Sequence, residues 1–282
     1  MIHAGLVLEG GGMRGLYTAG VIDFLIEKDI VFENSYGVSA GACYLCNYMS
    51  KQFKRSYHAG IDFNNDGRYC GVRSLLLTGD YFNVKTAYDL VPNKFLPYDY
   101  KQASKFEGKA YATVTNIVTG KPEYLRMKEM HHDILYVRAS ASLPLMARNV
   151  EINGNLYLDG GVSDPIPIRH AIAEGNEKNL VVITKPVGYV RKPSSMLGLI
   201  KARYLRKYPE LCKRMETRHT DYNETMAFIE EQEKAGKIFV LRPQEPDDIK
   251  RIEKDKDKLE KLYQKGYDDA KANYEKMMAF FA

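Results

Sequence analysis

The sequence predicts an α/β protein with a mainly parallel central sheet covered by helices. Strand-like apolar runs alternate with helix-like segments from the first residues onward, which is the order expected of parallel βαβ units. The chain has 282 residues, and 45% of them are hydrophobic, which is enough to bury a sizeable core in one large domain. No run approaches the roughly 18 consecutive apolar residues that a membrane-spanning helix needs.

The first four elements follow one another closely. Residues 4–9 form an apolar run that ends at the glycines 10–12, a pattern typical of a buried strand followed by a tight turn. Residues 13–28 then carry apolar side chains at helical spacing. Residues 30–36 are the second strand candidate, and residues 40–49 are the second helix candidate.

The next stretch, residues 51–96, is rich in Tyr, Asn and Gly and has one apolar run at 72–77. We expect it to form loops and short helices over the entrance of a site. Two hairpins follow. Thr119-Gly120-Lys121-Pro122 connects one pair of strand candidates, and Asn153-Gly154 is a strong two-residue turn signal between another pair. The second hairpin delivers Asp159 at the end of its second arm.

Residues 180–184 and 238–241 are further strand candidates, and the long helical segment between them is expected to break near Pro209. Residues 249–281 carry an apolar stripe among many Lys, Glu and Asp residues, which predicts a helix that docks against the main domain. A helix that binds a partner or a membrane is the alternative. The expected boundary separates a main domain, residues 1–245, from a helical extension, residues 246–282.

A first candidate for chemistry is the pentapeptide Gly37-Val38-Ser39-Ala40-Gly41, a G-x-S-x-G between a predicted strand and a predicted helix. Such a turn holds its serine in a strained conformation, and the flanking glycines leave room for the sharp change of direction. The hydroxyl then lies at a helix N-terminus, where the helix dipole favours developing negative charge. Ser39 is therefore a candidate nucleophile.

The second candidate is the segment Gly10-Gly11-Gly12-Met13-Arg14-Gly15, whose glycines expose backbone N–H groups before a helix, as an oxyanion hole requires. The same residues also match the G-x-G-x-x-G of dinucleotide-binding proteins. That interpretation needs an acidic residue at the end of the second strand, where this chain has the serine turn instead. A hydrolase is therefore favoured over a dinucleotide-binding protein.

A nucleophilic serine needs a base, and none of the six histidines has an obvious catalytic setting. His170 would complete a Ser–Asp–His order, but only two strands precede Ser39, too few for an α/β-hydrolase sheet. Asp159, with Gly160 and Gly161 behind it, is the remaining candidate, because a carboxylate can act directly as a base when it reaches the hydroxyl.

These motifs, in this order, resemble the patatin-like phospholipase family. Residues 139–144 are similar to the small-residue segment that precedes the aspartate strand in that family, and residues 164–167 to the stretch that follows it. The resemblance covers residues 5–173. Glu9 departs from the pattern, since many members have Asp there, and residues beyond Val190 match only loosely.

The resemblance implies a three-layer α/β/α fold and a Ser39–Asp159 dyad that works without histidine, metal or cofactor. It also implies an oxyanion hole formed by the N–H groups of residues 10–12, with Arg14 fixing the loop or adding positive charge. The substrate would be a lipid acyl ester, cleaved as by a phospholipase A, a lysophospholipase or a lipase. A His-dependent esterase, a nucleotide-dependent enzyme and a non-catalytic lipid-binding protein are the alternatives.

Charge is unevenly distributed along the chain. Residues 191–215 contain eight Lys or Arg against Glu210 alone, a balance of +7, so the rest of the chain carries −2 of the total of +5. Mixed with apolar residues, the segment 194–215 could contact an anionic membrane, or it could be a solvated face of a packed helix. No nucleic-acid-binding motif accompanies it. Nothing in the sequence indicates an oligomeric state.

The four cysteines are too scattered for a disulfide framework, and we interpret Cys43 and Cys46 as small apolar residues of a helix rather than as a redox pair. Residues 1–9 lack the basic start of a signal peptide, so a cytoplasmic location is expected, with peripheral membrane contact as an option.

Overall fold

The computed structural model describes residues 1–245 and 248–282 and contains a central sheet of eight strands. Along the sheet the order is β5-β6-β3-β2-β1-β7-β8, with β4 paired to β3 beside this path. The strands are β1 (Ile2–Leu8), β2 (Phe32–Val38), β3 (Lys109–Asn116), β4 (Pro122–Met127), β5 (Val150–Ile152), β6 (Asn155–Asp159), β7 (Asn179–Val182) and β8 (Ile238–Leu241).

The centre of the sheet is parallel. Strand β1 lies between β2 and β7, β2 also pairs with β3, and β7 pairs with β8, all in parallel. Both hairpins expected from the sequence are present as the antiparallel pairs β3–β4 and β5–β6, and β6 joins the sheet antiparallel to β3. The prediction of a mainly parallel sheet is confirmed.

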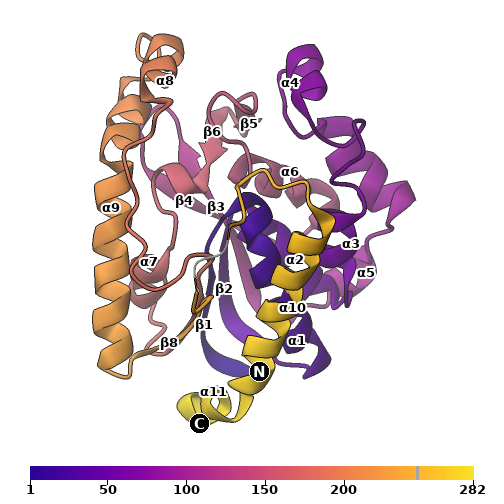
Figure 1. Cartoon of the computed structure of the whole chain (residues 1–282), viewed down its shortest axis with the longest axis vertical. Coiled ribbons are helices and arrows are strands. Elements are labelled where there is room, and N and C mark those ends of the chain that lie inside the picture. The colour runs from indigo at the N-terminus through magenta and orange to yellow at the C-terminus, as the bar shows by residue number, and fades with distance from the viewer. Residues whose placement is uncertain (246–247) are drawn as a thin grey trace.

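Helices cover both faces of this sheet, which makes the three-layer α/β/α architecture visible in Figure 1. Helices α1 (Leu16–Glu27), α2 (Ala40–Ser50), α6 (Met130–Ser140) and α10 (Lys256–Ala272) pack on one face, and α7 (Ile168–Ala173) and α9 (Pro209–Lys234) pack on the other. The short α11 (Tyr274–Phe281) follows α10. Pro209 occupies the first turn of α9, so the helical segment is interrupted before it, as expected.

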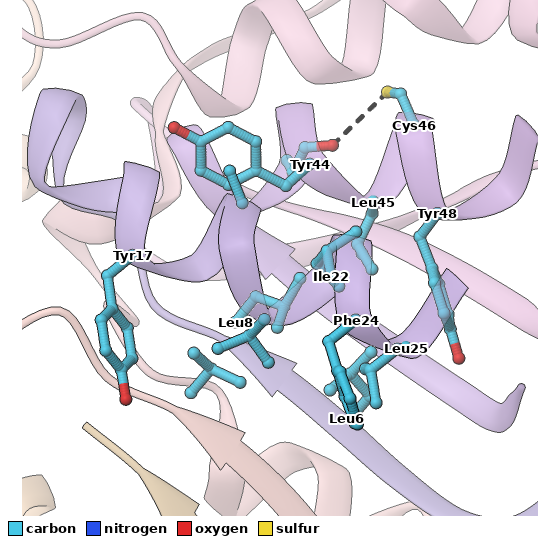
Figure 2. Packing of buried hydrophobic residues seen from close by; sticks show 14 of the residues in the cluster. Leu6, Leu8, Tyr17, Ile22, Phe24, Leu25, Tyr44, Leu45, Cys46 and Tyr48 are labelled. Carbon is cyan, nitrogen blue, oxygen red and sulfur yellow. Dashed lines mark hydrogen bonds between the residues drawn. The ribbon is translucent and has the colours of Figure 1, made fainter. Parts of the chain in front are cut away.

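The larger core lies between β1 and the first two helices (Figure 2). Leu6 and Leu8 of β1 are completely buried, as are Ile22 of α1 and Leu45 of α2. Burying each of these side chains contributes about 1.5–3 kcal/mol. The core therefore fixes the two segments that leave the ends of β1 and β2, and those are the segments that carry the Gly-rich loop and Ser39.

Helix α10 crosses α1 with its backbone in contact with the backbone of α1. A Cβ added at Gly20 of α1 would collide with the Tyr263 carbonyl oxygen, and one at Gly266 of α10 would collide with the Tyr17 carbonyl oxygen. Two glycines, one in each helix, thus permit this close approach. The predicted docking of the C-terminal helical segment on the main domain is confirmed by the burial of its apolar stripe, including Leu259, Leu262 and Met277.

The beginning of that segment was predicted wrongly. Helix was expected from residue 249, but α10 begins at Lys256, because the Asp255 side chain caps it by accepting the N–H groups of Asp257 and Lys258. Ile252, expected in the buried stripe, is exposed in the non-helical stretch before it. The expected domain boundary adjoins residues 246–247, which lie outside the described residues, and it stays a prediction.

The stretch from 51 to 96 forms short helices and turns, as expected. It contains α3 (Arg55–Ile61), α4 (Val72–Thr78) and a π-helical segment, Thr86–Phe95, and α5 (Tyr100–Ala103) follows. The remaining helix, α8 (Leu197–Tyr204), precedes α9. Over residues 1–245 and 248–282, none of the helices has the length and apolar character needed to cross a bilayer.

Candidate active site

Ser39 occupies the turn between β2 and α2 in a conformation that side-chain-bearing residues rarely adopt. Its φ is 54° and its ψ is −120°. The neighbouring backbone makes this turn tight: a Cβ at Gly37 would lie 2.7 Å from Ala42, and one at Gly41 would lie 2.5 Å from the Leu8 carbonyl oxygen. Strain of this kind costs about 1–3 kcal/mol and persists only where surrounding structure imposes it.

A side chain from α6 helps to impose it. The backbone N–H of Ser39 donates to Ser140 Oγ at 2.9 Å, and that hydroxyl donates to the Thr113 carbonyl oxygen at 2.6 Å. Ser140 is completely buried and so ties the turn to β3. It lies in the small-residue segment noted in the sequence, but no sequence signal indicated this contact.

The strand register brings Asp159 to the same end of the sheet. Val38, which precedes Ser39, pairs with Thr113 of β3, and the next residue of β3, Val114, pairs with Asp159 of β6. Strand β3 therefore lies between β2 and β6, and the side chains of Ser39 and Asp159 both lie at its carboxyl end. The Asp159 Oδ1 atom accepts the Gly161 N–H at 2.7 Å, which orients the carboxylate. At Gly160 a Cβ would collide with the Thr113 carbonyl oxygen.

The Asp159 carboxylate is buried and lies close to the Ser39 hydroxyl. Burial raises the pKa of Asp159, while a hydrogen bond from Ser39, the Gly161 N–H and the positive charges of Arg218 and Arg251 lower it. Oδ2 has no hydrogen-bond partner among the described residues. A buried carboxylate with one open oxygen beside a hydroxyl is suited to accept a proton.

The Gly-rich loop leaves the end of β1 and runs directly past Ser39. A Cβ at Gly10 would lie 2.7 Å from Ser39 Cβ, and one at Gly11 would lie 2.8 Å from Thr184 Oγ1. Gly12 has a φ of 59°, which favours glycine. Within the described residues, the N–H groups of Gly10 and Gly11 donate to no protein acceptor. An oxyanion hole requires N–H donors without a protein acceptor, as these two are.

Arg14 and Gly15 lie in the 3₁₀ turn that continues this loop into α1. Arg14 is half-buried, its Nε has no partner, and it is not among the described residues that line the cavity at Ser39. A Cβ at Gly15 would lie 2.9 Å from Ala40 Cβ, so this glycine lets the loop pack against the start of α2.

Glu9 fixes the start of the loop. Its carboxylate accepts the N–H of Thr184 at 2.6 Å, the Thr184 hydroxyl at 2.9 Å and the Tyr222 hydroxyl at 2.9 Å. Thr184 follows β7, and Tyr222 belongs to α9. One buried carboxylate therefore joins the ends of β1 and β7 to helix α9. The departure at Glu9 therefore keeps a buried carboxylate at the start of the loop.

Ser39 opens into a cavity of about 730 Å³ whose walls are mostly apolar. Side chains from α2 and from the stretch after α4 supply much of the lining, including Cys43, Tyr44, Phe82 and Tyr88. This volume falls within the usual range of ligand pockets. Residues 51–96 therefore contribute to the cavity, as the sequence analysis expected.

Two pocket residues come from parts of the chain where the sequence offered no signal. Arg218 of α9 donates its Nε–H to the Gly161 carbonyl oxygen. Arg251 lies before α10; its carbonyl oxygen accepts the Met13 N–H at 3.0 Å, and its side chain packs on Gly12. Both arginines line the cavity with Ser39. Only the folded topology brings them there.

The remaining candidates from the sequence are His170, Cys43 and Cys46, and each of them has a structural role. The ring of His170 stacks on Tyr124 with 3.4 Å between ring centroids and meets Tyr36 edge-on, and it does not line the cavity in the described part of the chain. Cys43 and Cys46 are free thiols of α2, and burial raises the pKa of Cys43 to about 12. Neither thiol is activated, which agrees with their interpretation as apolar residues.

Comparison with known proteins gives two family matches. A family model described as patatin-like phospholipase matches residues 6–172, which include the Gly-rich loop, Ser39 and Asp159. A second model, described as a domain of unknown function, matches residues 208–282, which include Arg218 and Arg251.

The chain is also similar to individual proteins over different parts of its length. The chain is 28% identical to the uncharacterized protein YjjU of Escherichia coli over 86% of its own length and 68% of that protein. It is 30% identical to lysophospholipase nte1 of Aspergillus fumigatus over 59% of its length, but spans only 11% of that much longer protein. The crystal structure of VipD from Legionella pneumophila aligns with a TM-score of 0.43 at 12% identity, over 98% of this chain and 67% of VipD.

Proposed function

The chain belongs to the patatin-like phospholipase family, and we propose that it hydrolyses lipid acyl esters with Ser39 as nucleophile and Asp159 as base. The observation that carries the proposal is the strained Ser39, which lies beside a buried carboxylate at the wall of a large apolar cavity. An acyl chain fits such a cavity, and the scissile ester would then lie at the serine.

The reaction follows from these positions. Ser39 Oγ attacks the carbonyl carbon of the ester while Asp159 accepts the hydroxyl proton. The tetrahedral oxyanion accepts hydrogen bonds from the N–H groups of residues 10–12, with the start of α2 directed at the same charge. Asp159 returns the proton to the leaving alcohol, and the acyl group stays on Ser39. Water, deprotonated by Asp159, then releases the fatty acid and restores the hydroxyl.

The first test is covalent labelling. Intact-mass analysis after treatment with a fluorophosphonate probe should show one adduct on the wild-type protein and none on Ser39→Ala. Asp159→Asn should label at least about 10³-fold more slowly, since it removes the base. His170→Ala is the matched control and should label at the wild-type rate; a strong loss there would instead favour a His-dependent esterase. A folded wild-type protein that takes no label would refute the proposal.

We further propose that the basic segment 194–215 contacts an anionic membrane, together with α4. Helices α4 and α8 project at the same end of the molecule (Figure 1). Leu76 and Leu77 of α4 are 80% and 73% exposed, and Leu199 of α8 is 58% exposed. Met196 and Ile200 of the α8 region line the cavity, so a membrane at this end would lie close to the path of a lipid substrate.

A further inference from the structure

Two guanidinium groups from the region matched as a domain of unknown function face the cavity beside Ser39. Arg218 is held next to the Asp159–Gly161 turn: its Nε–H donates to the Gly161 carbonyl oxygen, and Nη2 lies 3.6 Å from where a Gly161 Cβ would be. Arg251 is held on the other side, against Gly12 and Met13 of the Gly-rich loop. The arginines therefore flank the place where the ester would react.

Neither arginine forms an ion pair within the described part of the chain. Among residues 1–245 and 248–282, no carboxylate lies within ion-pair distance of Arg218 or Arg251. Glu9 already accepts three hydrogen bonds, and its one ion-pair contact within the described residues is with Arg191 at 3.8 Å. Among the described residues, Asp159 acts on both arginines, and its carboxylate also interacts with Ser39.

Positive charge is therefore in excess around this end of the cavity. Arg14, Arg191, Arg218 and Arg251 act on one another, against the two carboxylates of Glu9 and Asp159. Burial and the neighbouring Arg191 and Arg251 lower the pKa of Arg218 to about 9. Protein interiors do not retain unpaired cations without a compensating group, so this excess would be offset by an anionic ligand.

We propose that Arg218 and Arg251 form a subsite for a net-anionic phosphate group on the substrate, adjacent to the ester that Ser39 cleaves. Guanidinium groups bind phosphate oxygens in a fixed, bidentate geometry. A phosphomonoester, which carries about −1.5 to −2 at pH 7, can accept hydrogen bonds from both guanidinium groups and balance their charge. A phosphocholine headgroup would bring a quaternary ammonium toward the same cations, which is unfavourable. The inference rests on the proposed esterase function.

The test compares three esters with the same acyl chain in mixed micelles of excess neutral detergent, which removes any effect of surface charge. They are 1-oleoyl-glycerol 3-phosphate, its phosphocholine counterpart and 1-oleoylglycerol. The wild-type kcat/KM should be highest for the phosphomonoester. In Arg251→Gln, the ratio of kcat/KM for the phosphomonoester to that for 1-oleoylglycerol should fall at least tenfold, and Arg251→Lys should recover part of it.

Arg126→Gln is the matched control, because it removes the same charge from an exposed position of β4 that does not line the cavity in the described part of the chain. Its ratio should equal that of the wild type. An Arg251→Gln ratio equal to that of the wild type would overturn the subsite while leaving the esterase intact; no turnover of any of the three esters would overturn the esterase itself. Calorimetry gives a readout independent of turnover. The Ser39→Ala variant should bind 1-oleoyl-glycerol 3-phosphate, and the double variant Ser39→Ala with Arg251→Gln should lose this binding.

Discussion

The hydroxyl of Tyr263 in α10 donates to the buried carboxylate of Asp23 in α1 at 2.7 Å. The same carboxylate accepts the Lys54 N–H at 3.1 Å, so it joins three segments of the fold. Burial raises the pKa of Asp23 to about 6, although these hydrogen bonds lower it. The folded protein therefore binds this proton more tightly than the unfolded chain does.

A pH-dependent stability follows. Because the folded pKa of Asp23 lies above its unfolded value of about 3.8, its favourable contribution is fully present below pH 3.8 and is lost as the pH rises through 6. Asp23→Asn keeps an acceptor without the charge. The difference in free energy of unfolding between Asp23→Asn and the wild type should shift by about 2–3 kcal/mol in favour of the variant from pH 4 to pH 7. Urea unfolding at several pH values measures this difference; one that stays constant with pH would contradict it.

The contact between Gly10 and Ser39 predicts a selective loss of activity. Gly10→Ala would place a methyl group 2.7 Å from Ser39 Cβ and 2.8 Å from the Val38 carbonyl oxygen, so the loop must move away from the serine. We expect ester hydrolysis to fall about 10²-fold or more, as for the loss of an oxyanion-hole donor. Gly67→Ala is the control, since nothing lies within 4 Å of its added Cβ. Equal kcat values in the two variants would argue against the loop's role.

The charge of Arg251 predicts a shift in the pH profile. Burial raises the pKa of Asp159, and the positive charge of Arg251 lowers it, so removing that charge raises it further. A base works only when deprotonated, so the acid limb of kcat/KM for 1-oleoylglycerol should move to higher pH in Arg251→Gln. In Arg251→Lys it should stay near the wild-type position. An acid limb at the same pH in all three proteins would show that Arg251 does not act on Asp159.

The exposed leucines of α4 predict a loss of membrane contact. Leu76→Glu with Leu77→Glu should lower binding to vesicles that contain anionic phospholipid by about tenfold or more, because two large apolar contacts are replaced by charges that the lipid repels. Phe53→Glu is the control: this exposed residue follows the far end of α2, away from Ser39. Co-sedimentation with vesicles measures both. Equal loss in both proteins would indicate an unspecific charge effect.

The sequence predicted the sheet, the order of its elements and the motifs that meet at Ser39, because each of these depends on local patterns. A buried strand followed by glycines, or an Asn-Gly turn before Asp159, is visible in a few consecutive residues. The structure brings Gly10, Ser39 and Asp159 to one end of the sheet. Their catalytic roles stay predictions.

What the sequence could not show are contacts between distant segments. Arg218 lies within a helix of many charged residues, and Arg251 precedes a helix whose start was predicted too early. Neither has a local pattern that distinguishes it from a solvated surface charge. Their positions depend on the docking of α9 and α10, which is set by side-chain packing over long sequence separations.

The backbone contact between α1 and α10 also has a consequence for protein synthesis. A nascent chain exposes the glycine loop, Ser39 and Asp159 long before Ala272, the last residue of α10, leaves the ribosome. At about 5–20 residues per second, roughly the next hundred residues take about 5–20 s to translate. During this interval the face of α1 that contains Gly20 is open, and Met13 lacks its Arg251 acceptor. The glycine loop can therefore complete these contacts only after Arg251 and α10 have been translated.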